Sequence, residues 1–557
     1  MPSSMKEGIL CNLCRQTQKK LFDFSTSNHQ KIIDLAVNAC KIAGPPEICN
    51  YFVPNKANYL LPLRTEFLKK SDYFCSILLK ICPLKTTKFT IEEFKHDLVT
   101  KFPPQTIPIP KDSKPFKAIV IGDTHIQMSY KFKSKRTCSN GVSCCSERSG
   151  ETFEKSSQAG FWGSPGSPCD LPKHFFDKSI QLIKDKHIDA DALIVLGDHP
   201  AHDYFVQNEM YVSEVNSYVL NSLVGNFSIP VIPVLGNHEC HPADYLNWDD
   251  PNSYVRKYIF PSYSSMISKQ EMKQLVEDGF YERIFSENNL KLISFNSQFF
   301  DIFNDYLTKN ATDPLGALWK LSASFYNSEF KGEKVILLTH IPISDHSTSH
   351  FYSKCLNVLL ERFKETFGGM LSSHTHNDQL KFLKTESGEY FGMNYVSPSL
   401  TTFASYRPSY RVYSVVNGTI YDFDQFNVDL DDYNERAYND DFDIEFSLAY
   451  NFRKEYNLNN IHPREFGILY DKLRNTSSSE STKYLINFFT EKLSGMENQR
   501  NYLICSLDSD SEKMMKCSSE YDSHGWLGGL PPRIFRFFFE SDWFIDIDGS
   551  KEFESQV

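Results

Sequence analysis

The sequence contains no stretch that is apolar enough to span a bilayer, so no transmembrane helix is expected. It also has no excess of positive charge, because 59 Lys and Arg residues stand against 70 Asp and Glu residues. The resulting formal charge of -11 argues against a nucleic-acid-binding surface. Residues 1–10 lack the long apolar core of a signal peptide, so either the true start is missing or export follows another route.

What the sequence does contain indicates a folded protein with more than one domain. Its 557 residues exceed one ordinary hydrophobic core, so we expect two or three domains. A hydrophobic content of 41%, with 14% aromatic residues, supports globular folding.

Five short blocks of acids, histidines and one asparagine are the most informative feature. Four of them directly follow apolar runs, such as Ala118–Ile121 and Val335–Leu338, that predict buried strands. Side chains at the ends of such strands are expected to meet in one cleft. The blocks are Gly122-Asp123-Thr124-His125, Gly197-Asp198, Gly236-Asn237-His238-Glu239, Thr339-His340 and Ser373-His374-Thr375-His376.

These residue types suit a pair of divalent metal ions. Such a pair needs a carboxylate that bridges both ions, for which Asp198 is the natural candidate, and neutral imidazole nitrogens as further ligands. The ions activate a water-derived nucleophile and stabilise the charge on the phosphoryl oxygens. One block alone is more typical of a solvated loop or a core histidine, but five ordered blocks predict a two-metal phosphoesterase.

The cysteine count and the glycosylation signals indicate an oxidising compartment. Fourteen cysteines, an even number, occur together with four Asn-x-Ser/Thr acceptors. We therefore expect a secreted or lysosome-like glycoprotein. The acceptors are Asn226, Asn310, Asn417 and Asn475.

The first six cysteines alternate with amphipathic stretches, one of which includes Leu35 and Ala36. Their spacing resembles a saposin domain, in which a helical hairpin opens its apolar interior toward lipid. A zinc site is disfavoured because a second Cys-x-x-Cys is absent, whereas a disulfide-braced bundle without a lipid function stays open as an alternative. The resemblance implies the pairs Cys11–Cys82, Cys14–Cys75 and Cys40–Cys49.

A proline-rich stretch, Phe102–Pro110, follows this module and should be extended and semi-rigid rather than helical. It either holds the lipid module near the rest of the chain or acts as a simple spacer.

Further stretches together look like the acid sphingomyelinases, from the saposin-like module to about Leu458. They are Cys144-Cys145, Gly160-Phe161-Trp162-Gly163, Cys169-Asp170-Leu171-Pro172, Gly197–Asp203, Asp313-Pro314 with Trp319, Pro398–Phe403 and Tyr410–Tyr413.

This resemblance implies an α/β, layered metallophosphoesterase core of two facing β-sheets flanked by helices. An all-α saposin-like domain would precede the core, and a helical C-terminal region would follow it. The implied division is a saposin-like domain at 1–86, a linker at 87–114, a catalytic domain at 115–440 and a C-terminal region and tail at 441–557.

Carried over residue by residue, the family pattern assigns seven ligands to two zinc ions, with Asp198 shared. One ion takes Asp123, His125, Asp198 and His376, and the other takes Asp198, Asn237, His340 and His374. His238 is expected to be the general acid, His202 its partner in phosphate stabilisation, and Glu239 a residue that orients His238 or a ligand.

The chain departs from the family pattern at His199, Thr339 and Ser373, none of which removes a ligand. We expect His199 to be tolerated on the surface. The resemblance also implies disulfides Cys138–Cys144 and Cys145–Cys169, and Cys505 is expected to pair with Cys517. Cys240 and Cys355 are left over, and the sequence leaves open whether they form a bridge.

The expected activity is a phosphodiesterase that cleaves sphingomyelin to ceramide and phosphocholine. Its partner would be a sphingolipid membrane or vesicle, reached through the saposin-like domain without a transmembrane segment, and a monomer is expected. The alternatives are a phosphodiesterase of nucleotides or other soluble diesters and a catalytically inactive lipid-binding protein. The aromatic tail, residues 534–545, is expected to dock on the core.

Overall fold

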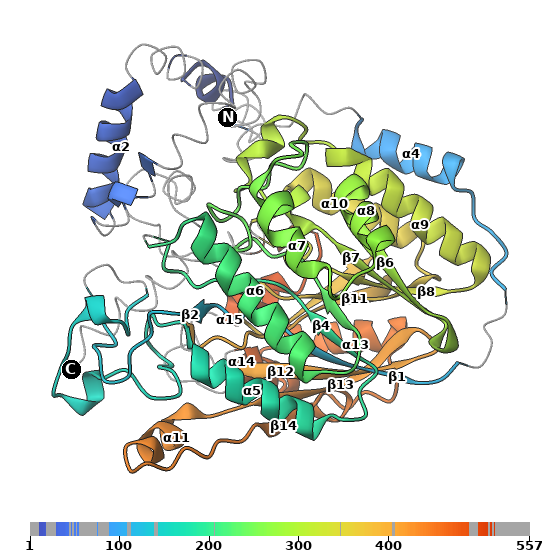
Figure 1. Ribbon diagram of the computed structural model, residues 1–557. Coiled ribbons are helices and arrows are strands. Elements are labelled where there is room, and N and C mark those ends of the chain that lie inside the picture. Colours follow the sequence, from blue (N-terminus) through green and yellow to red (C-terminus); the bar gives the residue numbers. More distant parts are fainter. Residues whose placement is uncertain are drawn as a thin grey trace.

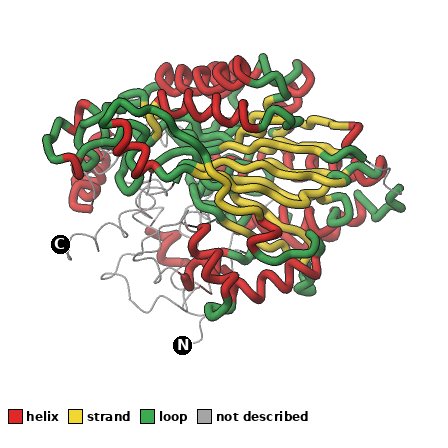
Figure 2. Tube along the Cα trace, turned by 90° about the horizontal axis from the view of Figure 1, so that it is seen from below, coloured by secondary structure: helices red, strands yellow, loops and turns green. Residues whose placement is uncertain are grey.

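The computed structural model describes most of the chain between residues 89 and 510 and shorter pieces at both ends. The described ranges are 11–17, 20, 29–43, 46, 49–51, 53–54, 75, 89–108, 113–138, 143–204, 206–345, 347–403, 407–488, 500–510, 513–514 and 517. Within them, two six-stranded sheets lie between layers of helices, as Figures 1 and 2 show. The predicted layered core of two facing sheets is confirmed.

The first sheet joins three parallel strands to three antiparallel ones, in the order β14-β13-β12-β1-β4-β5. Three of the apolar runs in the sequence form its parallel part, β1, β4 and β5. The strands are β1 (Phe116–Ile121), β4 (Ala192–Val195), β5 (Val231–Pro233), β12 (Ser409–Val416), β13 (Thr419–Asn427) and β14 (Ser447–Asn451).

The second sheet has the order β10-β11-β9-β8-β7-β6 and is parallel except for its two edge strands. Strand β2 (Ile126–Gln127) follows soon after β1 in the chain and forms a separate parallel pair with β3 (Leu171–Pro172). The strands of the second sheet are β6 (Phe280–Phe285), β7 (Leu290–Phe295), β8 (Lys334–Leu338), β9 (Phe367–Ser372), β10 (Gln379–Lys384) and β11 (Tyr390–Val396).

Alternation along β1 decides which layer each side chain joins. Ala118 and Val120 belong to the core that the two sheets share, whereas Ile119 and Ile121 pack in a second core with residues of α5 and α6. Because both faces of the strand are covered, its sequence is a continuous apolar run.

Helices α5 (Lys173–Lys186) and α6 (Glu209–Asn226) cover the outer face of the first sheet. Helices α9 (Ala317–Lys331) and α10 (His350–Arg362) pack with the second sheet, and α4 (Ile91–Lys101) lies against α10. The others are α2 (His29–Ala43), α7 (Phe260–Tyr263), α8 (Lys269–Asp278), α11 (Leu430–Ala437), α12 (Phe452–Glu455), α13 (Pro463–Arg474), α14 (Ser479–Phe488) and α15 (Arg500–Ser506).

Two segments differ from the expected division of the chain. Helix α4 lies inside the expected linker. A helix forms there because Thr90 and Glu93 form a capping box and Phe94 and Leu98 are buried in the core. Strand β14 lies beyond residue 440, so the first sheet extends into the region expected to be helical. The aromatic tail at 534–545 lies outside the described residues.

The predicted disulfides Cys14–Cys75, Cys40–Cys49, Cys138–Cys144, Cys145–Cys169 and Cys505–Cys517 are all present. Cys11 is also disulfide-bonded, and its expected partner Cys82 lies outside the described residues. The open question about the last two cysteines is answered, because Cys240 and Cys355 are both free and buried.

The N-terminal module touches the catalytic core beside one of the predicted site loops. The Tyr51 hydroxyl donates a hydrogen bond to the Gln207 carbonyl at 2.8 Å, and the Gln207 amide donates to the Ala201 carbonyl. Helix α2 itself lies apart from both sheets in Figure 1. Among the described residues, none of the helices combines the length and the apolar character that crossing a membrane requires.

Candidate active site

Seven polar side chains meet where strands of the two sheets end. Five of them have positive φ angles, between 38° and 73°, which side chains larger than glycine rarely adopt. A glycine at these positions would relieve the strain but has no side chain to bind a metal ion. The strained backbone conformation therefore marks a functional site. The seven are Asp123 and His125 after β1, Asp198 after β4, Asn237 after β5, His340 after β8, and His374 and His376 after β9.

These side chains form two groups that Asp198 connects. Asp123, His125 and His376 form one group, and Asp198, His340 and His374 form the other. Asp198 Oδ2 lies 3.0 Å from His340 Nε2 and 3.6 Å from His125 Nε2. All seven predicted ligands therefore lie together, and none is more than 5% exposed.

In the second group, nitrogen and oxygen atoms with lone pairs lie close together, as they do around a bound cation. His340 Nδ1 donates to the Leu196 carbonyl at 2.7 Å, so Nε2 is the nitrogen that carries the lone pair whenever the ring is neutral. Nε2 lies 3.0 Å from both Asn237 Oδ1 and Asp198 Oδ2. Nitrogen and oxygen atoms in this arrangement fit a divalent metal ion.

The first group has the same character. His125 Nδ1 donates to the Pro200 carbonyl at 2.8 Å, and its Nε2 faces His376 Nε2 at 3.0 Å. Burial, followed by the nearby histidines, holds the pKa of His125 well below its usual range, so the ring is neutral as a metal ligand must be. The donor set of the chain therefore fits a metal ion at each group.

The raised pKa values of Asp123 and His340 indicate the same need for positive charge. Burial, against the lowering effect of His340 and with help from the nearby Asp198 carboxylate, raises the pKa of Asp123 to about 7. Burial alone would lower the pKa of His340, but the Asp198 and Asp123 carboxylates outweigh it and raise that pKa to about 9. Divalent cations bound at these groups would replace the protons that the raised pKa values favour.

Glu239 fixes the backbone that carries the shared carboxylate. Its two oxygens accept from the N–H groups of Asp198, His199 and Gly236 at 2.7–3.0 Å. Glycine is required at position 236, where the backbone passes close to the shared carboxylate, because an added Cβ would lie 2.2 Å from Asp198 Oδ1. The expected orienting role of Glu239 is thus directed at the Asp198 loop.

The two predicted acid–base histidines have different partners. His202 Nδ1 lies 2.9 Å from Asp170 Oδ1, whereas His238 Nε2 lies 3.0 Å from the Tyr204 hydroxyl. Both rings pack against His125, with centroids 4.2 and 4.5 Å away. Sequence reasoning missed Asp170 and Tyr204 as site residues, and only their places beside Cys169 and in the His202 loop could have indicated them.

The surface position expected for His199 is wrong. The side chain is buried, and its Nδ1 lies 3.1 Å from the Thr124 hydroxyl. Glu239 holds the His199 N–H at 2.7 Å, so the loop after β4 folds inward instead of outward. The Ser373 hydroxyl packs against Gly122 in the same layer, where an added Cβ would come within 2.8 Å of it.

Comparison with known proteins gives matches over the core and over the whole chain. A family model, Calcineurin-like phosphoesterase, matches residues 116–378. Sphingomyelin phosphodiesterase B of Dictyostelium discoideum is 25% identical over 523 residues, covering 90% of this chain and 79% of the relative. Sphingomyelin phosphodiesterase 2 of Caenorhabditis elegans is 28% identical, covering 66% of this chain and 65% of the relative.

Two other matches cover a smaller share of this chain. A cyclic GMP-AMP phosphodiesterase of Mus musculus is 23% identical, over 58% of this chain and 74% of the relative. A dimetal phosphatase structure from Danio rerio covers 56% of this chain and 95% of its own, with 14% identity and a TM-score of 0.36.

The ligand loops at the strand ends lie within residues 116–378, so the geometry and the family match describe the same part of the chain. This chain contains a calcineurin-like phosphoesterase domain and is a relative of the sphingomyelin phosphodiesterases.

Proposed function

We propose that this chain is a two-metal phosphodiesterase that hydrolyses sphingomyelin to ceramide and phosphocholine. The observation that carries the proposal is the pair of buried ligand groups that share Asp198 Oδ2. Similarity to sphingomyelin phosphodiesterases over 90% of the chain supports the lipid substrate. Imidazole nitrogens with two carboxylates and one amide oxygen favour zinc as the metal.

The seven ligand residues would hold two zinc ions, Asp198 between them. Bound there, the ions would lower the pKa of water to give the nucleophile and stabilise the charge of the phosphoryl oxygens. Asp123, His125 and His376 complete one site, and Asn237, His340 and His374 complete the other. Glu239 keeps the Asp198 backbone fixed, so the shared carboxylate does not need to reorganise during turnover.

His238 is proposed to donate the proton that allows the ceramide alkoxide to leave, and His202 to bind the phosphate. The chain places both rings within 4.8 Å of each other and against His125. Because an alkoxide is a poor leaving group, His238→Gln should lower the rate with sphingomyelin by roughly a hundred- to ten-thousandfold.

A substrate with an acidic phenol as leaving group needs little protonation and should lose far less activity in the same variant. Metal content is measured beside both rates, because a disturbed ligand would imitate the effect. Equal losses on the two substrates with metals retained would make His238 a phosphate-binding residue instead of the acid.

The N-terminal module is proposed to present the lipid, in a secreted or lysosomal monomer. Leu35 on α2 is 65% exposed although apolar, which is the property that a lipid-contacting residue needs. Leu35→Asp should lower activity on sphingomyelin vesicles and leave hydrolysis of a soluble diester unchanged. Ile188→Asp is the matched control, since Ile188 is 90% exposed and lies before β4, at the end of the strand opposite to the site.

A soluble diester as the natural substrate is the second candidate, favoured by the similarity to a cyclic GMP-AMP phosphodiesterase. Metal-loaded protein is assayed on sphingomyelin vesicles, phosphatidylcholine vesicles and nucleotide diesters. We expect the highest kcat/KM on sphingomyelin. A higher value on the nucleotide diesters, with none of the lipids cleaved, would replace the proposal with the second candidate.

A further inference from the structure

The residue that holds His202 comes from the insertion between β2 and β3. Asp170 is buried and uses both carboxylate oxygens on His202: Oδ1 lies 2.9 Å from Nδ1, and Oδ2 accepts the backbone N–H at 2.8 Å. The Thr401 hydroxyl donates to Oδ1 at 3.3 Å. Asp170 therefore determines both the loop position and the ring orientation of His202.

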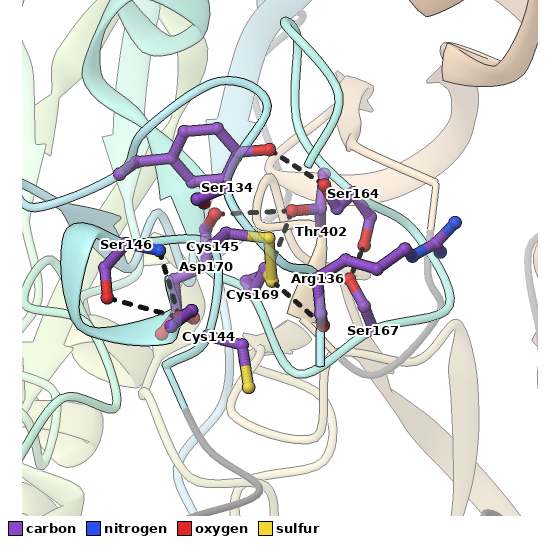
Figure 3. Close-up of a disulfide and its surroundings, with 12 residues drawn as sticks. Ser134, Arg136, Cys144, Cys145, Ser146, Ser164, Ser167, Cys169, Asp170 and Thr402 are labelled. Atoms are coloured by element: carbon purple, nitrogen blue, oxygen red, sulfur yellow. Dashed lines mark hydrogen bonds between the residues drawn. A yellow bond between two sulfur atoms is a disulfide. The ribbon is translucent and has the colours of Figure 1, made fainter. Parts of the chain in front are cut away.

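The insertion in turn fixes Asp170. Cys169, its neighbour in the chain, is bonded to Cys145, and the Thr402 hydroxyl donates to the Cys169 carbonyl at 3.0 Å (Figure 3). Gln127 accepts from the Asp170 N–H at 3.1 Å and donates to the Cys144 carbonyl at 2.7 Å. The disulfide and these hydrogen bonds thus hold the backbone that carries the Asp170 carboxylate.

The other side of the His202 ring is constrained independently. Phe403 stacks on the ring with a centroid distance of 4.0 Å and an interplanar angle of 12°. Phe403 fixes the plane of the ring, and Asp170 fixes which nitrogen points away from the metal-ligand groups. Among the described residues, no hydrogen-bond partner reaches the buried Nε2, and His202 groups with His125 and His238.

We propose that Asp170 is a positioning residue, which acts through His202 by holding its Nε2 toward the reacting phosphate. A carboxylate on one imidazole nitrogen sets the orientation and tautomer of the ring, as it does for histidines that bind metals. The inference rests on the proposed phosphodiesterase function for its reaction, but it concerns phosphate binding and therefore does not depend on which diester is cleaved.

The test is a double-mutant cycle in the full chain with Asp170→Asn, His202→Ala and the double variant. Asparagine keeps the size of Asp170 but replaces one acceptor oxygen with an N–H donor. It can therefore serve only one of the two His202 N–H groups. We expect kcat on a soluble phosphodiester to fall about 10- to 100-fold in Asp170→Asn, with metal content and KM little changed.

In the His202→Ala background, Asp170→Asn should change kcat by less than about twofold, because the group through which it acts is gone. A second readout needs no turnover: the affinity for inorganic phosphate, measured by calorimetry, should show the same coupling. A loss of the same size in both backgrounds would overturn the proposal and give Asp170 a role in folding alone. If Asp170→Asn does not fold, the same cycle with Asp170→Glu decides.

Asp203→Asn is the matched control. Asp203 is a buried carboxylate of the same loop, but it accepts from Gln207 and Tyr211 and not from the His202 ring. Its effect should be equal with and without His202, and coupling as strong as that of Asp170 would contradict the proposal. A wild-type protein that binds phosphate but cleaves no diester would refute the proposed function, while the calorimetric cycle would still test Asp170.

Discussion

The metal-ligand loops and the insertion between residues 128 and 170 contribute to the same site but are held in place by different means. The ligands follow directly on buried parallel strands, so the two sheets place them. Asp170 follows a segment with little regular structure, which two disulfides and side-chain hydrogen bonds hold. The position of the ligands is a property of the fold, whereas the position of His202 depends on covalent bracing.

This difference predicts that damage to the two regions separates metal binding from turnover. Loss of a ligand removes the metal chemistry, whereas loosening of the insertion leaves both metal ions in place and displaces only the residues that act on the phosphate.

The largest effect is expected for Asp198→Asn. The variant loses the shared charge between the two ligand groups, and several kcal/mol of transition-state stabilisation correspond to roughly a thousandfold or more in kcat. Circular dichroism and a thermal melt check that the fold is kept, and kcat is measured on a soluble diester. Wild-type rates in this variant would remove Asp198 from the mechanism.

An intermediate effect is expected when the Cys145–Cys169 disulfide is removed by substituting both residues with serine. Activity should fall because Asp170 is no longer held next to a fixed Cys169, while metal content stays at the wild-type level. The matched control replaces Cys138 and Cys144, which close a shorter loop in the same insertion. Equal losses of activity in the two double variants would mean that neither disulfide has a specific role in holding Asp170.

The smallest effect concerns a histidine far from both regions. Burial, with help from Lys117 and Lys186, lowers the pKa of His187 to about 4. In the unfolded chain this ring takes up a proton near pH 6.5, whereas in the folded chain it stays neutral down to about pH 4. The free energy of unfolding therefore falls as the pH drops from about 6.5 to 4. His187→Gln should lose less stability than wild type between pH 7 and pH 5 in urea titrations. Identical losses would contradict this pKa.

The ligand loops could be predicted from the sequence because they follow apolar runs, and the runs before Asp123, Asp198, Asn237 and His340 do form strands. The order of the strands in each sheet could not be predicted from the sequence. Burial on both faces makes each strand a continuous apolar run, so no alternation distinguishes one strand from another.

The partners of the acid–base histidines could not be predicted either. Asp170 and His202 are 32 residues apart, and their contact depends on the path of an insertion without a periodic pattern. His199 was placed wrongly for a related reason, because its inward position follows from the Glu239 carboxylate on a different strand end.

The most direct test of the account is metal analysis of the gently purified full chain, with activity followed through chelation and reconstitution. The account predicts two divalent ions per chain in the wild type, loss of activity as they are removed, and its return when zinc is added. It also predicts fewer ions in Asp198→Asn and an unchanged number in Asp170→Asn. A wild-type protein that contains no metal and keeps its activity in the presence of chelators would contradict the central claim.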